Sequence, residues 1–178
     1  MHAGHQRNSG RAITVKRDYL LFTLLTLIVV LLDQASKWLM VANLEPYQAH
    51  SVIPGFFDLV LVRNKGMAFG ILGQSSSHVP AYLLMGATLA AIAVIMVFFW
   101  RARRDQKWLT VGLALILGGA VGNLVDRIRL KFVIDFLDFS IKGYHWPAFN
   151  LADSAVTIGT LWLLLNLILG KSLSEAKP

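Results

Sequence analysis

The stretch FVIDFLDFSIKGYHWPAFNLADS, residues 132–154, joins two long apolar segments and carries a carboxylate near each of its ends. Asp135 lies in VIDF and Asp153 lies in NLADS, both beside apolar residues. An unpaired charge is costly in such surroundings, and in a membrane segment the default reason for keeping one is function. Two carboxylates held close together at one bilayer surface would share protons, and their pKa values would separate. One could then act as an acid and the other as a base.

Composition places the chain among membrane proteins. It has 178 residues, of which 56% are hydrophobic, with a mean hydropathy of +0.58 and a net charge of +7. This is too apolar for an ordinary soluble domain. The basic residues stand beside apolar runs rather than on one polar face, so membrane topology explains them better than nucleic-acid binding. Cysteine is absent, which excludes thiolate nucleophiles, disulfides and cysteine-based metal sites.

Four apolar segments predict four membrane-spanning helices, at about residues 19–41, 81–100, 108–125 and 151–169. The second is the clearest, because a segment of about twenty residues without a charge can cross about 30 Å of hydrocarbon as a helix. A cleaved signal peptide is a rival interpretation of the first, but no small-x-small cleavage site follows it. We expect one membrane domain over residues 18–170, between a flexible cytoplasmic tail at 1–17 and a second cytoplasmic tail at 171–178.

Residues 43–72 break the helical pattern and predict a small β-cradle outside the bilayer core. Proline and glycine separate short apolar runs in this region. Residues 57–62 are rich in aromatic and β-branched side chains and predict a strand, and RNKG at residues 63–66 predicts a turn. The expected fold is therefore an all-α membrane protein with four spanning helices and a small extracytoplasmic sheet.

The distribution of charge predicts the orientation in the membrane. An even number of spans puts both termini on one side, together with the basic loop at residues 101–107. That side holds the whole net charge of +7, because acids and bases balance on the other side. By the positive-inside rule, both termini are cytoplasmic and the loop that carries Asp135 faces outward.

Asp153 has two interpretations at the start of the last span. Pro147 stops any preceding helix and Asn150 is well placed as an N-cap, so Asp153 becomes the third residue of the helix. As a structural residue, Asp153 would form a capping pair with Asn150. As a catalytic residue, it would be kept ionised by the helix dipole, which suits a general base.

Asp135 also has a structural alternative, namely an exposed strand or loop residue at the headgroup level. Burial among its apolar neighbours would instead raise its pKa. Because the last two spans are consecutive and antiparallel, the loop between them can fold Asp135 against Asp153. One ionised and one protonated carboxylate could then activate water and polarise a scissile carbonyl. The residues alone do not assign the two roles.

Two polar pairs near the outer ends of the spans have scaffold interpretations. Asp33 and Lys37 are spaced i,i+4 in the first span and would neutralise each other, or contact substrate or lipid. Asp126 and Arg127 at the end of the third span also fit a scaffold pair, although Asp126 is the main competitor of Asp135 for the second catalytic acid.

The third span contains a signal for close helix packing. Gly118 and Gly122 form a GxxxG motif, which lets a neighbouring helix approach closely. Asn123 follows directly and could hydrogen-bond the outer loops. Such packing would give a rigid platform for a pair of carboxylates.

Other functional classes receive less support. The histidines lack metal-ligand spacing and HExxH is absent, while Ser154 lies in no G-x-S-x-G motif, which disfavours metal and serine hydrolase sites. A small transporter would place carboxylates near the middle of the bilayer and show an internal repeat, and neither is apparent. A non-enzymatic assembly factor would tolerate Asp to Asn changes at positions 135 and 153.

Five sequence blocks resemble bacterial signal peptidase II, the lipoprotein signal peptidase family. They fall in the order of that family and cover the chain from the first span to the last: LDQASK (32–37), RNKGMAFG (63–70), GGAVGNLVDR (118–127), VIDF (133–136) and PAFNLADS (147–154). The resemblance implies an aspartic endopeptidase of the bacterial inner membrane that removes signal peptides from prolipoproteins. Cleavage is expected just before a cysteine that carries diacylglycerol.

The resemblance also implies roles for particular residues. The catalytic aspartates of the family fall on Asp135 and Asp153. Other residues within its motifs are expected to line or brace the substrate pocket: Asp33, Lys37, Asn64, Gly66, Asn123, Asp126, Arg127, Asn150 and Ala152. No cofactor or metal is implied. The family fold adds a periplasmic loop or helix over the site, and the expected partners are lipidated prolipoproteins, membrane lipid and inhibitors such as the cyclic peptide globomycin.

Overall fold

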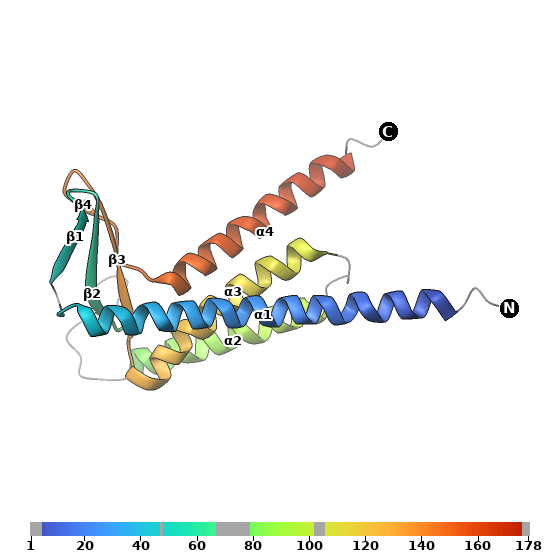
Figure 1. Cartoon of the computed structure of the whole chain (residues 1–178), viewed down its shortest axis with the longest axis horizontal. Helices are drawn as coiled ribbons and strands as arrows, with labels where there is room; N and C mark the ends of the chain where they lie inside the picture. The colour runs from blue at the N-terminus through green and yellow to red at the C-terminus, as the bar shows by residue number, and fades with distance from the viewer. Residues whose placement is uncertain (1–4, 47, 67–78, 102–105, 176–178) are drawn as a thin grey trace.

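The computed structural model describes residues 5–46, 48–66, 79–101 and 106–175, and shows four long helices with a small sheet at one end (Figure 1). The elements follow one another along the chain as α1 (His5–Asn43), β1 (Ala49–Ile53), β2 (Phe57–Asn64), α2 (Val79–Arg101), α3 (Lys107–Leu130), β3 (Val133–Ile141), β4 (Tyr144–His145) and α4 (Leu151–Glu175). The expected fold class, four spanning helices with a small sheet, is confirmed.

Each helix contains a stretch long and apolar enough to cross a membrane. These stretches are Tyr19–Asn43, Ala81–Arg101, Lys107–Leu130 and Leu151–Leu169. Large apolar side chains on α1, α2 and α4 are exposed, among them Leu31, Leu83 and Ile168, each about two-thirds exposed. Exposed apolar surface of this extent fits contact with lipid rather than water. Both chain ends lie at the opposite end of the helices from the sheet (Figure 1).

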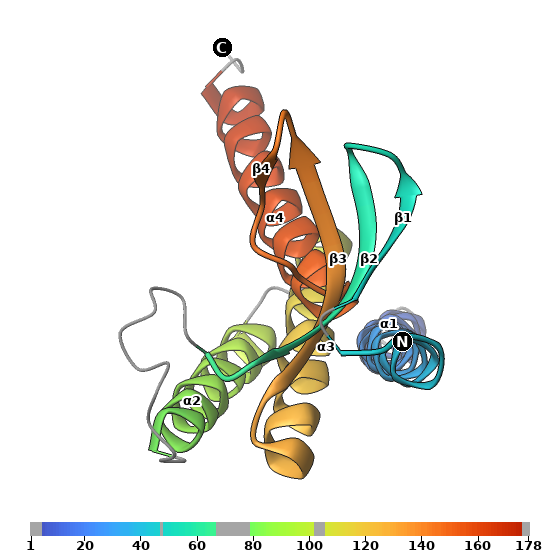
Figure 2. The ribbon, with the colours of Figure 1, turned by 90° about the vertical axis from the view of Figure 1, so that its left-hand side faces the viewer.

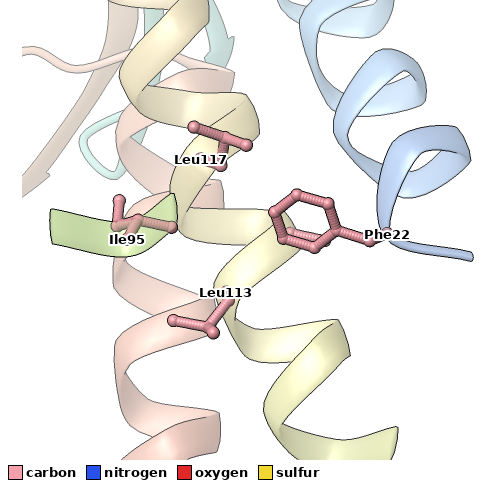
Figure 3. Close-up of a cluster of buried hydrophobic side chains, with 5 residues drawn as sticks. Phe22, Ile95, Leu113 and Leu117 are labelled. Carbon is pink, nitrogen blue, oxygen red and sulfur yellow. The ribbon is translucent and has the colours of Figure 1, made fainter. Parts of the chain in front are cut away.

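The helix α3 is the centre of the bundle, and more than half of its spanning stretch is buried. Phe22 of α1 and Ile95 of α2 meet Leu113 and Leu117 of α3 in the apolar core (Figure 3). The Phe22 ring also stacks on Phe99 of α2 with centroids 3.8 Å apart. This core holds α1, α2 and α3 together at a distance from the end of the bundle that carries the sheet.

Glycines let the neighbouring helices approach α3 closely, as the GxxxG motif predicted. A Cβ at Gly118 would lie 2.6 Å from Cβ of Val29 on α1, and a Cβ at Gly119 would meet the carbonyl oxygen of Ala152 on α4. Neither contact leaves room for a side chain. The backbones of α1 and α4 are therefore held against the outer half of α3, near the sheet.

The four strands form an antiparallel sheet in the order β1-β2-β3-β4. Lys142 and Gly143 connect β3 to β4 with φ of 52° and 83°, the left-handed conformation that a tight two-residue hairpin turn needs. Figure 2, in which α1 is seen nearly end-on, shows the strands running across the axis of α1, while α4 leans in the same direction as the strands. The sheet thus lies at the level where α1 ends.

The structure corrects several expectations about element boundaries. The helix α1 begins at His5, within the segment expected as a tail at 1–17, because no proline interrupts that segment and extending a helix costs less than starting one. Likewise, α4 continues to Glu175 into the expected tail. The strand β2 continues through Asn64 instead of turning there, and the expected loop after α3 contains β3 and β4. The part of the expected cradle at 67–72 lies outside the described residues.

Candidate active site

Four elements meet at the outer end of the bundle, and each contributes polar side chains. The helices α1 and α3 end close to β3, and α4 begins near the same place (Figure 1). Asp135 on β3 and Asp153 on α4 both contact Asn150, the residue that precedes α4. The sequence hypothesis that the loop folds these two aspartates together agrees with this geometry.

Asp135 is almost completely buried, with 1% of its surface exposed. Each of its carboxylate oxygens accepts one amide N–H: Asn64 Nδ2 donates to Oδ2 at 2.8 Å, and Asn150 Nδ2 donates to Oδ1 at 2.7 Å. Burial raises the pKa of Asp135 to about 6; the two amide donors oppose this shift, and the negative charge of Asp153 adds to it. Asp135 can therefore carry a proton near neutral pH.

Asp153 lies in the first turn of α4 in a different environment. Its Oδ2 accepts the backbone N–H of Asn150 at 3.2 Å, and its own N–H donates to Oδ1 of Asn150 at 3.0 Å, which is a capping box. Its Oδ1 accepts Nδ2 of Asn123 at 2.8 Å. Asp153 thus accepts hydrogen bonds from an amide and from a backbone N–H at the N-terminus of a helix.

A buried ion-pair cluster lies directly behind the two aspartates. Lys37 Nζ is 2.9 Å from carboxylate oxygens of both Asp33 and Asp126, and it donates to Oδ1 of Asn123 at 3.0 Å. All four side chains are at most 8% exposed. The predicted Asp33–Lys37 pair is confirmed, but Asp126 pairs with Lys37 rather than with Arg127, because the ammonium group reaches it across the α1–α3 contact.

The lysine determines which way the Asn123 amide faces. An ammonium group only donates hydrogen bonds, so the atom facing it must be the amide oxygen, and Nδ2 is left to donate to Asp153. The Asn150 amide is fixed in the same way, since its oxygen accepts the Asp153 N–H and its nitrogen faces Asp135. Lys37 thus orients a chain of amides that ends on the carboxylates.

The remaining residues of the sequence motifs brace this arrangement. Asp33 Oδ1 accepts the backbone N–H of Ala152 at 2.9 Å and so fixes the start of α4. Gly66 donates its N–H to Oδ1 of Asn64, the residue that contacts Asp135, and Gly66 has φ of 85°, a conformation that favours glycine. Arg127 Nη1 donates to the carbonyl oxygen of Asn123 at 3.5 Å.

Gln34 belongs to the cluster, although the sequence analysis did not single it out. Its Nε2 lies within hydrogen-bonding distance of Asp33 Oδ2, Asp126 Oδ1 and the carbonyl oxygen of Gly122, at 3.0–3.2 Å. The amide thereby adds a donor between two buried carboxylates. Its place between Asp33 and Lys37 in LDQASK was the available signal, but adjacent helix residues do not usually share a face.

A hollow of about 330 Å³ lies between α2, α3 and α4. Small residues form much of its wall: Ala87, Ala91, Gly119 and Ala120. Asn123 and Arg127 line the same hollow, and Asn123 is the residue that donates to Asp153. The hollow is therefore linked to Asp153 through Asn123. Over the described part of the chain, no three His, Cys, Asp or Glu side chains are grouped as metal ligands would be.

This fold and site define a polytopic membrane enzyme with two carboxylates close together at the end of the bundle that carries the sheet. The family model of signal peptidase (SPase) II matches residues 25–169. The lipoprotein signal peptidase of Geobacter metallireducens is 45% identical over 154 residues, which cover 86% of this chain and 94% of that protein. That of Oleidesulfovibrio alaskensis is 44% identical over 142 residues, covering 80% and 90%.

Solved structures agree with these relatives. One bacterial membrane enzyme, 30% identical, matches with a TM-score of 0.75 over 88% of this chain and 93% of that one. A second, 31% identical, gives a TM-score of 0.73 over 82% and 91%. The chain belongs to the signal peptidase II family, and it is a membrane peptidase that cleaves lipoprotein signal peptides.

Proposed function

We propose that Asp135 and Asp153 are the catalytic pair of this peptidase, with Asp153 as the base and Asp135 as the acid. The observation that carries the proposal is their shared contact with Asn150 in two unlike environments. Asp153 accepts hydrogen bonds from Asn123 and from the backbone N–H of Asn150 at a helix N-terminus, a position that suits a carboxylate acting as the base. Burial raises the pKa of Asp135 to about 6, which favours its protonated form.

The reaction then needs one water molecule and one shared proton. Asp153 takes a proton from the water while the water oxygen attacks the scissile carbonyl carbon, and Asp135 gives its proton to the carbonyl oxygen. The tetrahedral intermediate collapses when Asp153 passes its proton to the leaving nitrogen. Asp135 recovers a proton from the intermediate as the carboxyl product forms, so both aspartates return to their starting states.

The substrate is a prolipoprotein whose cysteine already carries diacylglycerol, and cleavage falls just before that cysteine. The signal peptide occupies the hollow between α2, α3 and α4, because its small wall residues allow close approach of a helix and Asn123 connects it to Asp153. Inhibitors of the globomycin type would compete for this same site.

The enzyme lies in the bacterial inner membrane with both termini in the cytoplasm. Two observations support this orientation. Both chain ends lie away from the sheet, and the net charge of +7 falls on the side of the termini. The carboxylates then face the periplasmic surface, where a lipid-anchored substrate can reach them by lateral diffusion.

Cleavage of a diacylglyceryl-modified prolipoprotein by the purified full chain in lipid tests the proposal. Asp135→Asn and Asp153→Asn should lose turnover by about a thousandfold or more while still binding substrate. Asp138→Asn is the matched control, because Asp138 lies three residues further along β3 and pairs with His145. Normal turnover in either of the first two variants would refute the assignment, as would loss of turnover in Asp126→Asn alone.

A further inference from the structure

The sheet has two chemically different faces. Side chains alternate along β3, so Asp135, Leu137, Phe139 and Ile141 share one face, which we call the site face. Their cross-strand partners share it: Val62 opposite Asp135, Leu59 opposite Leu137, Phe57 opposite Phe139 and Tyr144 opposite Ile141. Beyond Asp135 the site face is apolar or aromatic. The other face carries the buried Ile134 and Phe136 near the helices and, further along, the polar side chains of Asp58, Asp138, Ser140 and His145.

A row of phenylalanines crosses the site face. The Phe139 ring stacks on Phe57 with centroids 4.7 Å apart and on Phe149 with centroids 5.9 Å apart, while Phe56 meets it edge-on at 5.5 Å. These rings come from the turn before β2, from β2 and β3, and from the segment before α4. They form a continuous apolar surface in line with Asp135.

A second hollow, of about 470 Å³, lies beside this row. Its lining is Phe56, Phe139, Ile141, Tyr144, Trp146 and Phe149, together with His145. Ile141, Trp146 and Tyr144 form an exposed rim, at 65%, 68% and 84% exposure. None of the lining residues is an acid, a lysine or an arginine, so an apolar ligand would meet little cost from desolvated charge.

The hollow and Asp135 lie on the same face of the sheet, because Phe139 and Ile141 alternate in step with Asp135 along β3. A strand rises about 3.3 Å per residue, so Phe139 and Ile141 lie roughly 13 and 20 Å from Asp135 on the same face. Asp135 contacts Asn150 at the start of α4, which turns the site face toward the spanning helices. The strands run across the axis of α1 near its end (Figures 1 and 2), so the sheet lies at the level where that span ends.

The rim residues fit that position. Tryptophan and tyrosine prefer the membrane–water interface, where one end of the ring is apolar and the other end is hydrated. A peptide would fit the hollow poorly, since its backbone N–H and C=O groups need partners that an apolar lining does not offer. A hydrocarbon chain needs none.

We propose that this hollow binds an acyl chain of the substrate's own diacylglyceryl group. This inference rests on the proposed function, in which the lipidated cysteine follows the scissile bond and so starts beside Asp135. The acyl chain leaves that point along the site face, passes the phenylalanine row and ends in the hollow. The enzyme therefore measures lipid length about 13–20 Å from the bond it cuts.

The test compares two substrates with the same peptide, one with palmitoyl chains and one with hexanoyl chains, in the full-length enzyme. Ile141→Ala and Trp146→Ala truncate exposed rim residues, so the fold should survive both changes. Each should lower kcat/KM for the palmitoyl substrate by about tenfold through lost apolar contact, and should change the hexanoyl value less than twofold. Ile53→Ala is the matched control, because Ile53 is half exposed on β1 and does not line the hollow.

Equal losses with both substrates, or no loss with either, would overturn the acyl-chain site. A palmitoyl substrate with a diazirine at the chain end gives a direct readout in the inactive Asp153→Asn enzyme, where labelling should fall within residues 139–149. Labelling confined to the spanning helices would contradict the proposal, and labelling by a diazirine phospholipid alone would assign the hollow to bulk lipid. Cleavage of both substrates by the parent, abolished by Asp135→Asn, upholds the catalytic proposal independently.

Discussion

Asn150 and Asp153 cap each other at the start of α4. The amide oxygen of Asn150 accepts the backbone N–H of Asp153 at 3.0 Å, and the backbone N–H of Asn150 donates to the Asp153 carboxylate at 3.2 Å. With its oxygen committed to Asp153, the Asn150 amide can present only its nitrogen to Asp135, at 2.7 Å. One residue therefore begins the last helix and holds both carboxylates in place.

Asn150→Asp separates these two roles. Aspartate is as good an N-cap as asparagine, so α4 should still begin at residue 151. The donor toward Asp135 is replaced by a second carboxylate oxygen, however, and turnover should fall by about a hundredfold or more. Helix content from circular dichroism and turnover are measured together, with the exposed Asn43→Asp as the matched control. Near-normal turnover in Asn150→Asp would show that the amide donor is not needed.

The stability of the parent should depend on pH through Asp135. Its pKa is about 6 in the folded protein against an ordinary value of 3.8, so the folded state binds the proton more tightly. The contribution of Asp135 to the free energy of unfolding is therefore most favourable below about pH 3.8, the ordinary pKa of an aspartate. This contribution is lost as the pH rises through about 6, by about 3 kcal/mol in total. Asp135→Asn lacks this dependence. Its free energy of unfolding relative to the parent should therefore rise between about pH 4 and pH 7, and a pH-independent difference would contradict the assignment.

Two neighbours should move the pKa of Asp135 in opposite directions. Asn64→Ala removes a hydrogen bond to the carboxylate, so the pKa should rise above about 6. Asp153→Asn removes a neighbouring negative charge, so the pKa should fall. Carboxyl infrared bands, assigned by their loss in Asp135→Asn, report both shifts. Shifts of the same sign would mean that Asp135 does not sense these two residues as described.

Lys37 is expected to be essential for stability. Lys37→Met leaves Asp33 and Asp126 buried without their cation and should cost about 3–5 kcal/mol. The exposed Lys142→Met should change stability by less than about 0.5 kcal/mol. Combining Lys37→Met with Asp33→Asn and Asp126→Asn should recover part of the loss, because no uncompensated charge remains. Unfolding in mixed micelles provides the comparison, and a Lys37→Met protein as stable as the control would exclude a buried ion-pair cluster.

Gly119 should tolerate no side chain. A Cβ there would meet the carbonyl oxygen of Ala152, a backbone atom that cannot rotate away, so Gly119→Ala should cost about 1–3 kcal/mol and displace the start of α4. A Cβ at Gly86 on α2 meets nothing within 4 Å, and Gly86→Ala should be neutral or stabilising by up to about 1 kcal/mol. Similar thermal stability of the two variants would mean that α3 and α4 are not in close contact at this point.

Local spacing predicted much of this site. The distance from Pro147 through Asn150 to Asp153 marks a helix start, and the i,i+4 spacing of Asp33 and Lys37 marks an ion pair. The four spans followed from apolar length alone. Each of these signals lies within a few residues, where backbone geometry limits the possible contacts.

Contacts between distant residues could not be derived from spacing. Asp126 finds Lys37, and Asn64 finds Asp135 across 71 positions, only because the helices and strands pack as they do. The strand β3 was expected as loop, since its apolar residues are buried on both faces near the helices and lack a clear alternation. Gln34 was missed in part for the same reason, because two of its three partners, Gly122 and Asp126, lie on α3.

A double-mutant cycle on Asp135 and Asp153 tests the central claim most directly. Single-turnover cleavage of the lipidated prolipoprotein is measured for Asp135→Asn, Asp153→Asn and the double variant, each with substrate binding verified. If the two aspartates form one catalytic unit, each single variant should fall to the same residual rate as the double variant, by about a thousandfold or more. If the double variant is instead much slower than either single variant, because the two rate losses multiply, the two carboxylates act independently. That result would contradict the paired mechanism.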